Sequence, residues 1–202
     1  MGASRTQWSG TFPPVTAVDP RAVILVEGVS DQRALEALAA RRERNLDAEG
    51  ISIVAMGGSK SFGNFLERFG PRGLNLTVAG LYDAGEVDDF RRGLSRAGLG
   101  SDLTQAEMEA LGFYVCDADL EDELIRALGT ATVEQIVDEQ GEMRSFRTLQ
   151  KQPAQQGRTT HAQLRRFMGS RGGRKIQYAP VLVDALDLDR VPRPLDAVLG
   201  HG

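Results

Sequence analysis

Acidic side chains follow three short apolar segments of the sequence, and their spacing suggests a shared chemical site. Glu27 comes directly after the apolar run 22–26, and Asp31 follows four residues later. Asp83 ends a second such run, and a group of acids at 117–123 follows a third. Clusters of carboxylate ligands that include no histidine or cysteine favour hard cations such as Mg²⁺ and Mn²⁺ over zinc. Two such ions about 4 Å apart can activate water and stabilise the leaving oxygen in phosphodiester cleavage.

These acids need a scaffold that brings them together. Apolar runs alternate with segments of helical spacing, which predicts a parallel β-sheet covered by helices. The expected strands are 22–26, 51–55, 76–82 and 112–116, and the expected helices are 30–44, 62–69, 87–99 and one that begins at Leu120. Right-handed crossovers place the carboxyl ends of parallel strands on one edge of a sheet, so the acids should converge there. Taken singly, several of them could instead stabilise helix N-termini.

From residue 130 onward the pattern is entirely helical, with expected helices at 133–140, 143–150, 161–168 and 175–186. Nine Lys or Arg and no Asp or Glu occur between Arg144 and Lys175. This asymmetry predicts a basic flank that grips phosphates beside the acidic edge. The alternative is a solvated face of a helical appendage, and His161 within it is expected to be an ordinary surface residue.

The expected organisation has three parts. Residues 1–20 are polar and contain proline, which predicts a flexible tail with Trp8 and Phe12 frayed rather than docked. Residues 21–129 form the catalytic core, and residues 130–202 form a helical, basic extension packed on it.

Composition excludes several classes of protein. The formal charge is −4, so any polyanion site must be a local patch. The single cysteine, Cys116, rules out an intramolecular disulfide framework and suits a reducing cytoplasm. Two histidines argue against a His-based metal centre. No apolar run approaches ~18 residues and no signal-peptide h-region is present, so neither a membrane span nor a secretory leader is expected.

The turn after the second expected strand contains Gly57, Gly58 and Lys60 and looks superficially like a phosphate loop. The Walker spacing of Gly, four residues, then Gly-Lys-Ser/Thr is absent, so a glycine-rich strand-to-helix turn is the simpler interpretation. Lys60 and backbone amides at a helix start could still meet a phosphate.

Four elements, in order, together resemble a TOPRIM domain, the metal-binding module of topoisomerases and primases. They are Leu-Val-Glu27-Gly-Val-Ser-Asp31, the strand ending at Asp83, Asp-Leu-Glu121-Asp-Glu-Leu, and Gly173-Arg-Lys175-Ile-Gln-Tyr178-Ala179 followed by Leu182. The chain is most similar to the TOPRIM half of OLD (overcoming lysogenisation defect) nucleases, from about residue 23 to residue 199. The resemblance implies an α/β fold, with a four-stranded, mostly parallel sheet flanked by helices and a helical C-terminal extension.

The resemblance also implies roles for individual residues. Glu27 would bind metal and assist proton transfer, Asp31 and Asp83 would bind metal, Glu121 would hold a second ion, and Lys175 would steady the scissile phosphate. The basic residues expected to contact phosphate or nucleic acid are Lys60, Arg165, Arg166, Arg174 and Lys175.

One position departs from the family's Asp-x-Asp motif, because Gly85 stands where the second Asp is expected. Glu86 lies beside it and is the expected replacement ligand. OLD proteins also carry an ATPase domain ahead of the TOPRIM half, so a separate ATPase subunit is an expected partner here, together with DNA.

These expectations favour a Mg²⁺- or Mn²⁺-dependent endonuclease that cuts or nicks DNA. Two alternatives stay open. One is a non-catalytic TOPRIM-like module that binds nucleic acid or a partner ATPase. The other is a nucleotide phosphotransferase or hydrolase.

Overall fold

Four parallel strands form the centre of the protein. The computed structural model describes residues 12–13, 15, 17 and 19–202, so Trp8 lies outside the described residues. The strands are β1 (Ala22–Val26), β2 (Ile51–Ala55), β3 (Thr77–Asp83) and β4 (Phe113–Cys116). Their order in the sheet is β2-β1-β3-β4, and every pairing is parallel. The expected α/β fold is confirmed, and the mostly parallel sheet is parallel throughout.

The strand register aligns the carboxyl ends of the sheet. Val26 at the end of β1 is opposite Ala55 of β2, and Asp83 at the end of β3 is opposite Cys116 of β4. The residues that follow each strand therefore emerge at one edge, where open parallel sheets bind their ligands.

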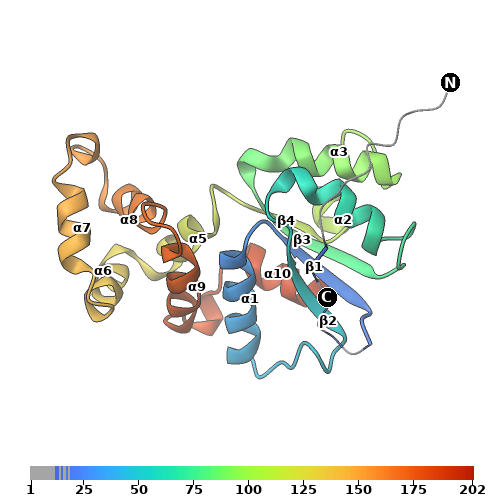
Figure 1. Cartoon of the computed structure of the whole chain (residues 1–202), viewed down its shortest axis with the longest axis horizontal. Coiled ribbons are helices and arrows are strands. Elements are labelled where there is room, and N and C mark those ends of the chain that lie inside the picture. Colours follow the sequence, from blue (N-terminus) through green and yellow to red (C-terminus); the bar gives the residue numbers. More distant parts are fainter. Residues whose placement is uncertain (1–11, 14, 16, 18) are drawn as a thin grey trace.

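The central strand β1 is buried on both faces, as expected of a continuous apolar run. Ile24 and Val26 belong to one hydrophobic cluster, whereas Val23 and Leu25 belong to the other. The first cluster contains residues of α1 (Val29–Arg41) and α10 (Arg193–His201); the second contains residues of α2 (Phe62–Phe69), α3 (Val87–Ala97) and α4 (Gln105–Ala110). Figure 1 shows α2 and α3 over one face of the sheet and α1 and α10 over the other.

The helical extension continues the first of these clusters. It consists of α5 (Leu120–Leu128), α6 (Thr130–Glu139), α7 (Met143–Gln150), α8 (Thr160–Met168) and α9 (Arg174–Asp184). Phe146, Phe167 and Tyr178 pack edge to face inside it. Helix α9 packs along α1, so the extension is joined to the sheet rather than tethered by a loop (Figure 1).

Two helices were missing from the sequence-based prediction, α4 and α10. Helix α10 follows Pro192, and its Leu195, Val198 and Leu199 are buried against the sheet. Their spacing is that of one apolar helical face, so the signal was present in the sequence. Short 3₁₀ turns also occur at Ser59–Ser61, Ala84–Glu86, Pro153–Gln155 and Leu188–Arg190.

The described part of the N-terminal segment packs on the core. The ring of Phe12 lies 5.0 Å from that of Phe65, and Ala17 is buried with its N–H donated to Ser52 Oγ at 3.1 Å. Among the described residues, no helix combines the length and apolar character needed to cross a membrane.

Candidate metal and nucleic-acid site

Glu27 leaves the end of β1 at the carboxyl edge of the sheet. Its carbonyl oxygen accepts the N–H groups of Gly57 at 2.9 Å and Gly58 at 3.2 Å. Both glycines have positive φ, +71° and +122°, a region that side-chain-bearing residues rarely adopt. The glycine pair therefore fastens the turn after β2 to the end of β1, and Lys60 is exposed on that turn.

Asp31 is in the first turn of α1. Its Oδ2 accepts the N–H of Gly28 at 2.8 Å, so it does stabilise the helix start. Burial raises the pKa of Asp31 to about 6, and the nearby charges of Glu121 and Glu27 add to the rise. The structure thus confirms that Asp31 stabilises the start of the helix, and its role as a metal ligand stays a prediction.

Asp83 and Glu86 lie at the end of β3 and in the turn Ala84–Glu86. Burial raises the pKa of Asp83 to about 8, with repulsion from Asp31, Asp119 and Glu27 in support. Burial also raises the pKa of Glu86 to about 7, followed by repulsion from Glu27. Among the described residues, Glu86 Oε2 is buried without a hydrogen-bond partner. At neutral pH Asp83 therefore keeps its proton for most of the time and Glu86 for about half of it, chiefly because both are buried and secondarily because their neighbours are acids.

Glu121 and Lys175 join α5 to α9. Lys175 Nζ donates to Glu121 Oε2 at 2.6 Å. Burial raises the pKa of Glu121, and Lys175 partly offsets that rise. Burial by itself would lower the pKa of Lys175, but the hydrogen bond and charge of Glu121 outweigh it, so the net shift is upward. The other oxygen, Glu121 Oε1, is buried without a partner in the described part of the chain.

Asp119 belongs to the same edge, although it was not singled out as a site residue from the sequence. It is the N-cap of α5: its Oδ1 accepts the N–H of Asp122 at 2.9 Å. Its Oδ2 accepts from Arg165 Nε at 2.8 Å, and its charge contributes to the raised pKa of Asp83. An acid two residues before Glu121 at a helix start was the available signal.

His161 is not the ordinary surface residue expected from the sequence. Its Nε2 lies 2.7 Å from Asp122 Oδ1, and 32% of its side chain is exposed. With Arg165–Asp119 and Lys175–Glu121, this contact makes a row of three charged or polar pairs between α5 and the helices α8 and α9. The prediction failed because the partner is 39 residues away in the sequence.

The donor set suits a hard divalent cation. It consists of carboxylate oxygens, two of which are buried without partners in the described structure, Glu86 Oε2 and Glu121 Oε1. A cation would also relieve the repulsion that adds to the effect of burial in raising the pKa values of Asp31, Asp83 and Glu86. No three His, Cys, Asp or Glu side chains of the described residues are arranged to hold a metal ion, so binding would require them to draw closer.

Gly85 leaves open space at this edge. Apart from its chain neighbours, no heavy atom lies within 4 Å of the position that a Cβ would occupy. A side chain could therefore begin at position 85 without meeting neighbouring atoms.

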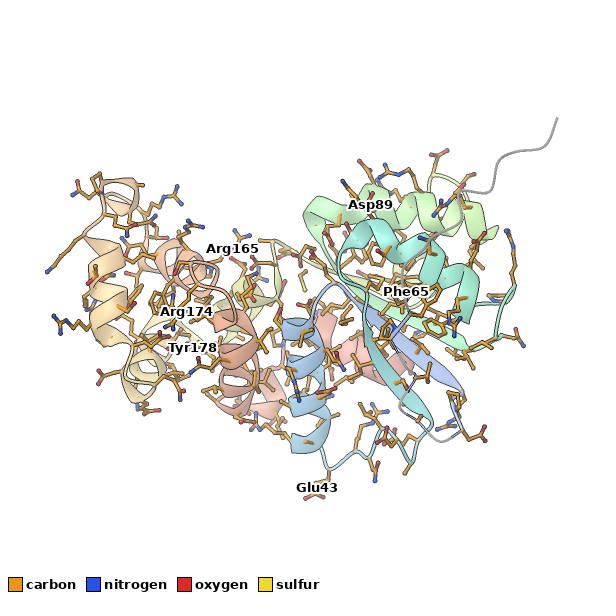
Figure 2. All side chains as sticks on the ribbon, in the orientation of Figure 1. Glu43, Phe65, Asp89, Arg165, Arg174 and Tyr178 are labelled. Atoms are coloured by element: carbon orange, nitrogen blue, oxygen red, sulfur yellow. The ribbon has the colours of Figure 1, made fainter. Side chains whose placement is uncertain are left out.

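The predicted phosphate-binding residues do not form one group. Arg165 lies against the acids through Asp119, and Arg166 is exposed on the opposite, basic part of the extension. Arg174 is only 5% exposed, and it donates to both carboxylate oxygens of Glu142 at 2.9 Å. Figure 2 shows Arg165 and Arg174 on the extension, while Asp89 lies on the helices above the sheet.

Comparisons with known proteins agree with this fold. The family model "Overcoming lysogenization defect protein-like, TOPRIM domain" matches residues 20–84, a range that includes Glu27, Asp31 and Asp83. A sequence comparison with curated proteins gives no significant match.

Solved structures of OLD proteins superpose on most of the chain. The C-terminal region of the Burkholderia pseudomallei OLD protein is 22% identical, with a TM-score of 0.67, 90% of this chain covered and 96% of that chain. Two structures of the C-terminal region of the Xanthomonas campestris pv. campestris OLD protein are similar. One is 24% identical with a TM-score of 0.70, covering 90% of this chain and 91% of the other. The second is 26% identical with a TM-score of 0.67, covering 91% and 94%. Residues 20–84 therefore match an OLD-like TOPRIM domain, and about 90% of the chain shares its fold with the C-terminal regions of OLD proteins.

Proposed function

We propose that the chain is a metal-dependent nuclease that hydrolyses or nicks the phosphodiester backbone of DNA with Mg²⁺ or Mn²⁺. The observation that supports this most strongly is a set of electrostatically coupled acids at one sheet edge, beside a protonated lysine. The acids, called the acidic edge below, are Glu27, Asp31, Asp83, Glu86, Asp119 and Glu121, and the lysine beside them is Lys175.

The proposed roles follow from position and charge. Glu27, Asp31, Asp83, Glu86 and Glu121 would hold the metal, which when bound lowers the pKa of water and stabilises negative charge on the leaving oxygen. Glu27 is the proposed acceptor of the proton from the attacking water. The buried strand β1 holds its backbone in place, and a general base must be held firmly near the proton that it accepts.

Lys175 would hold a non-bridging oxygen of the scissile phosphate. Its pKa is raised above the ordinary lysine value, so the ammonium group stays charged at neutral pH. Its hydrogen bond to Glu121 fixes the side chain at the acidic edge, where a phosphate would accept the remaining N–H groups.

The proposed partners are DNA and a separate ATPase subunit, since OLD proteins combine the TOPRIM half with an ATPase. The proposed compartment is the cytoplasm, because the single cysteine, Cys116, is a free and buried thiol.

A second candidate is a non-catalytic module that binds nucleic acid or the ATPase partner. Two of the acids already have protein cations, since Lys175 pairs with Glu121 and Arg165 pairs with Asp119. Gly85 supplies no carboxylate, so internal cations could neutralise the acidic edge without a metal. Hydrolysis or phosphotransfer on free nucleotides remains the third hypothesis, and the length of the basic extension favours a polymer over it.

Supercoiled plasmid incubated with Mg²⁺ or Mn²⁺ tests the nuclease proposal. Wild-type protein should produce nicked circles only with metal, and Glu27→Gln should slow the reaction about 100-fold or more. The matched control is Glu67→Gln, which removes an exposed carboxylate on α2 and should cleave like wild type.

Each alternative has its own outcome in this experiment. Wild-type protein that binds plasmid but never nicks it, with either metal, would contradict the nuclease proposal and favour the binding module. Equal nicking by wild type and Glu27→Gln would also contradict it, since the activity would not come from the acidic edge. Turnover of nucleotides alone, lost in Glu27→Gln, would favour the third hypothesis.

A further inference from the structure

A basic cavity lies in the helical extension, apart from the acidic edge. It encloses about 770 Å³ between α7, α8 and the start of α9. Its charged lining residues are Arg144, Arg166, Arg171, Arg174 and Glu142. This volume is within the range of sites that hold small molecules or parts of a larger ligand, ~300–1,000 Å³. None of the acids proposed to bind metal contributes to its lining.

The only acid among these residues is already neutralised. Arg174 Nε and Nη2 donate to the two oxygens of Glu142, each at 2.9 Å. This fork-shaped contact holds the pKa of Glu142 below its ordinary value, so the carboxylate is charged and occupied. Arg144, Arg166 and Arg171 therefore give the cavity an excess of positive charge.

Three guanidinium groups remain available to a ligand. Within the described part of the chain, those of Arg144 and Arg166 make no hydrogen bond or ion pair. Arg171 approaches Glu142 only at 3.8 Å, and 74% of its side chain is exposed. Like charges gathered without counter-ions repel one another, and an anion placed between them would remove that repulsion.

Arg174 forms the fixed floor of the cavity rather than a ligand contact. Its Nη1 donates to the carbonyl oxygen of Phe167 at 2.9 Å and to Ser170 Oγ at 2.7 Å. Its guanidinium carbon lies 3.9 Å from the centre of the Phe167 ring, which it covers. The lining contains Leu149 and Phe167 as well as the arginines, and Ser145 and Thr148 add hydroxyl groups that can donate to an oxyanion.

We propose that this cavity is a second, non-catalytic site that binds backbone phosphates of a nucleic-acid strand through Arg144, Arg166 and Arg171. The proposal rests on the proposed function, since it gives that function a substrate anchor. Guanidinium forks and hydroxyls match phosphate oxygens. The acidic edge is contacted by the same helix through Arg165, and this proximity favours a nucleic-acid strand over an acidic protein segment.

Helix α8 connects the two sites. Arg165 contacts Asp119 of the acidic edge, and the next residue, Arg166, lines the cavity. Successive helical residues point about 100° apart, so α8 has the acidic edge on one side and the basic cavity on another. A strand held in the cavity and crossing α8 would arrive at the acidic edge.

Metal-free binding measurements test this site independently of cleavage. The probe is a fluorescein-labelled single strand or duplex of about 30 nucleotides, measured by anisotropy in EDTA from ~50 to ~200 mM NaCl. Arg144→Gln/Arg166→Gln should raise Kd about tenfold or more and reduce the steepness of log K against log [salt] by about 1.4 for the single strand and about 1.8 for the duplex, because two phosphate contacts are lost. The matched control, Arg158→Gln, removes an exposed arginine of the same extension that does not line the cavity.

The outcomes separate the two proposals. Unchanged Kd and salt slope in the double variant, with wild-type thermal unfolding, would overturn the phosphate site even if plasmid nicking were observed. The same loss of affinity in Arg158→Gln would also overturn the phosphate site, because arginines outside the cavity would then contribute as much as those that line it. Poly-glutamate serves as a probe for acidic proteins. If the double variant lost affinity for poly-glutamate but not for DNA, the cavity would bind an acidic protein and the nucleic-acid proposal would be wrong. Conversely, the predicted loss of binding with no nicking by wild type would keep the phosphate site and remove the nuclease.

Discussion

Replacing Asp83 with asparagine should stabilise the metal-free protein, because this carboxyl group is held in an unfavourable place. The pKa of this group is about 8 in the folded protein, whereas an ordinary aspartate has a pKa of 3.8. Between these pH values the native state keeps a proton that the unfolded chain has lost, so the free energy of unfolding falls as pH rises. This loss begins near the unfolded pKa and is complete above about pH 8.

The size of the effect follows from the shift. If the whole pKa shift contributed, the free energy of unfolding would be lower by about 5 kcal/mol at pH 8 and by about a third of that at pH 5. Asp83 is only partly buried, so solvent screening reduces the expected gain for Asp83→Asn to about 2 kcal/mol at pH 8. In a chain of this length that corresponds to a rise in Tm of about 4–8 °C.

The assay is thermal unfolding in EDTA at pH 5 and pH 8, with Asp88→Asn as control. Asp88 is a carboxylate of α3 whose side chain is 77% exposed, so its replacement should change stability by less than about 0.5 kcal/mol. Saturating Mg²⁺ should then stabilise wild type more than Asp83→Asn, because only wild type keeps the ligand. A lower Tm for Asp83→Asn at pH 8, or the same gain at both pH values, would refute the reasoning.

Three further predictions concern the metal, the cavity floor and pH. Gly85→Asp fills the open position and should tighten Mg²⁺ binding about tenfold by calorimetry; unchanged affinity would mean that position 85 does not face the metal. Arg174→Met removes a buried guanidinium with its hydrogen bonds to Glu142 and to the carbonyl oxygen of Phe167, and should lower the free energy of unfolding by about 3 kcal/mol in urea titrations; unchanged stability would contradict its structural role. Apparent Mg²⁺ affinity should rise about 20-fold from pH 7 to pH 9, as Asp83 with a pKa of about 8 and Glu86 with a pKa of about 7 lose their protons. Affinity that is flat over this range would show that neither carboxyl group binds the ion.

The sheet and part of the acidic edge could be predicted from the sequence because both depend on local patterns. Apolar runs such as 22–26 fix the strands, and parallel topology then carries Glu27 and Asp83 to one edge. The recognition of an OLD-like TOPRIM domain was confirmed on the same residues.

What the sequence did not reveal were contacts between distant segments. Lys175 pairs with Glu121 across 54 positions, and Arg165 pairs with Asp119 across 46. Ion pairs have no periodic signal, so the basic segment was predicted as one phosphate-gripping face. The structure divides its arginines among the acidic edge, the structural floor at Arg174 and the open cavity.

The position of α10 bears on how the protein acquires its fold during synthesis. This helix covers β3 and β4, and Arg44 Nη1 of the loop after α1 donates to the carbonyl oxygen of Leu199 at 2.6 Å. The ribosome makes β1 about 170 residues before it makes α10, a delay of about ten seconds or more at ordinary elongation rates. Throughout that interval one apolar face of the nascent sheet lacks part of its final cover, so this face becomes fully buried only after α10 has been synthesised.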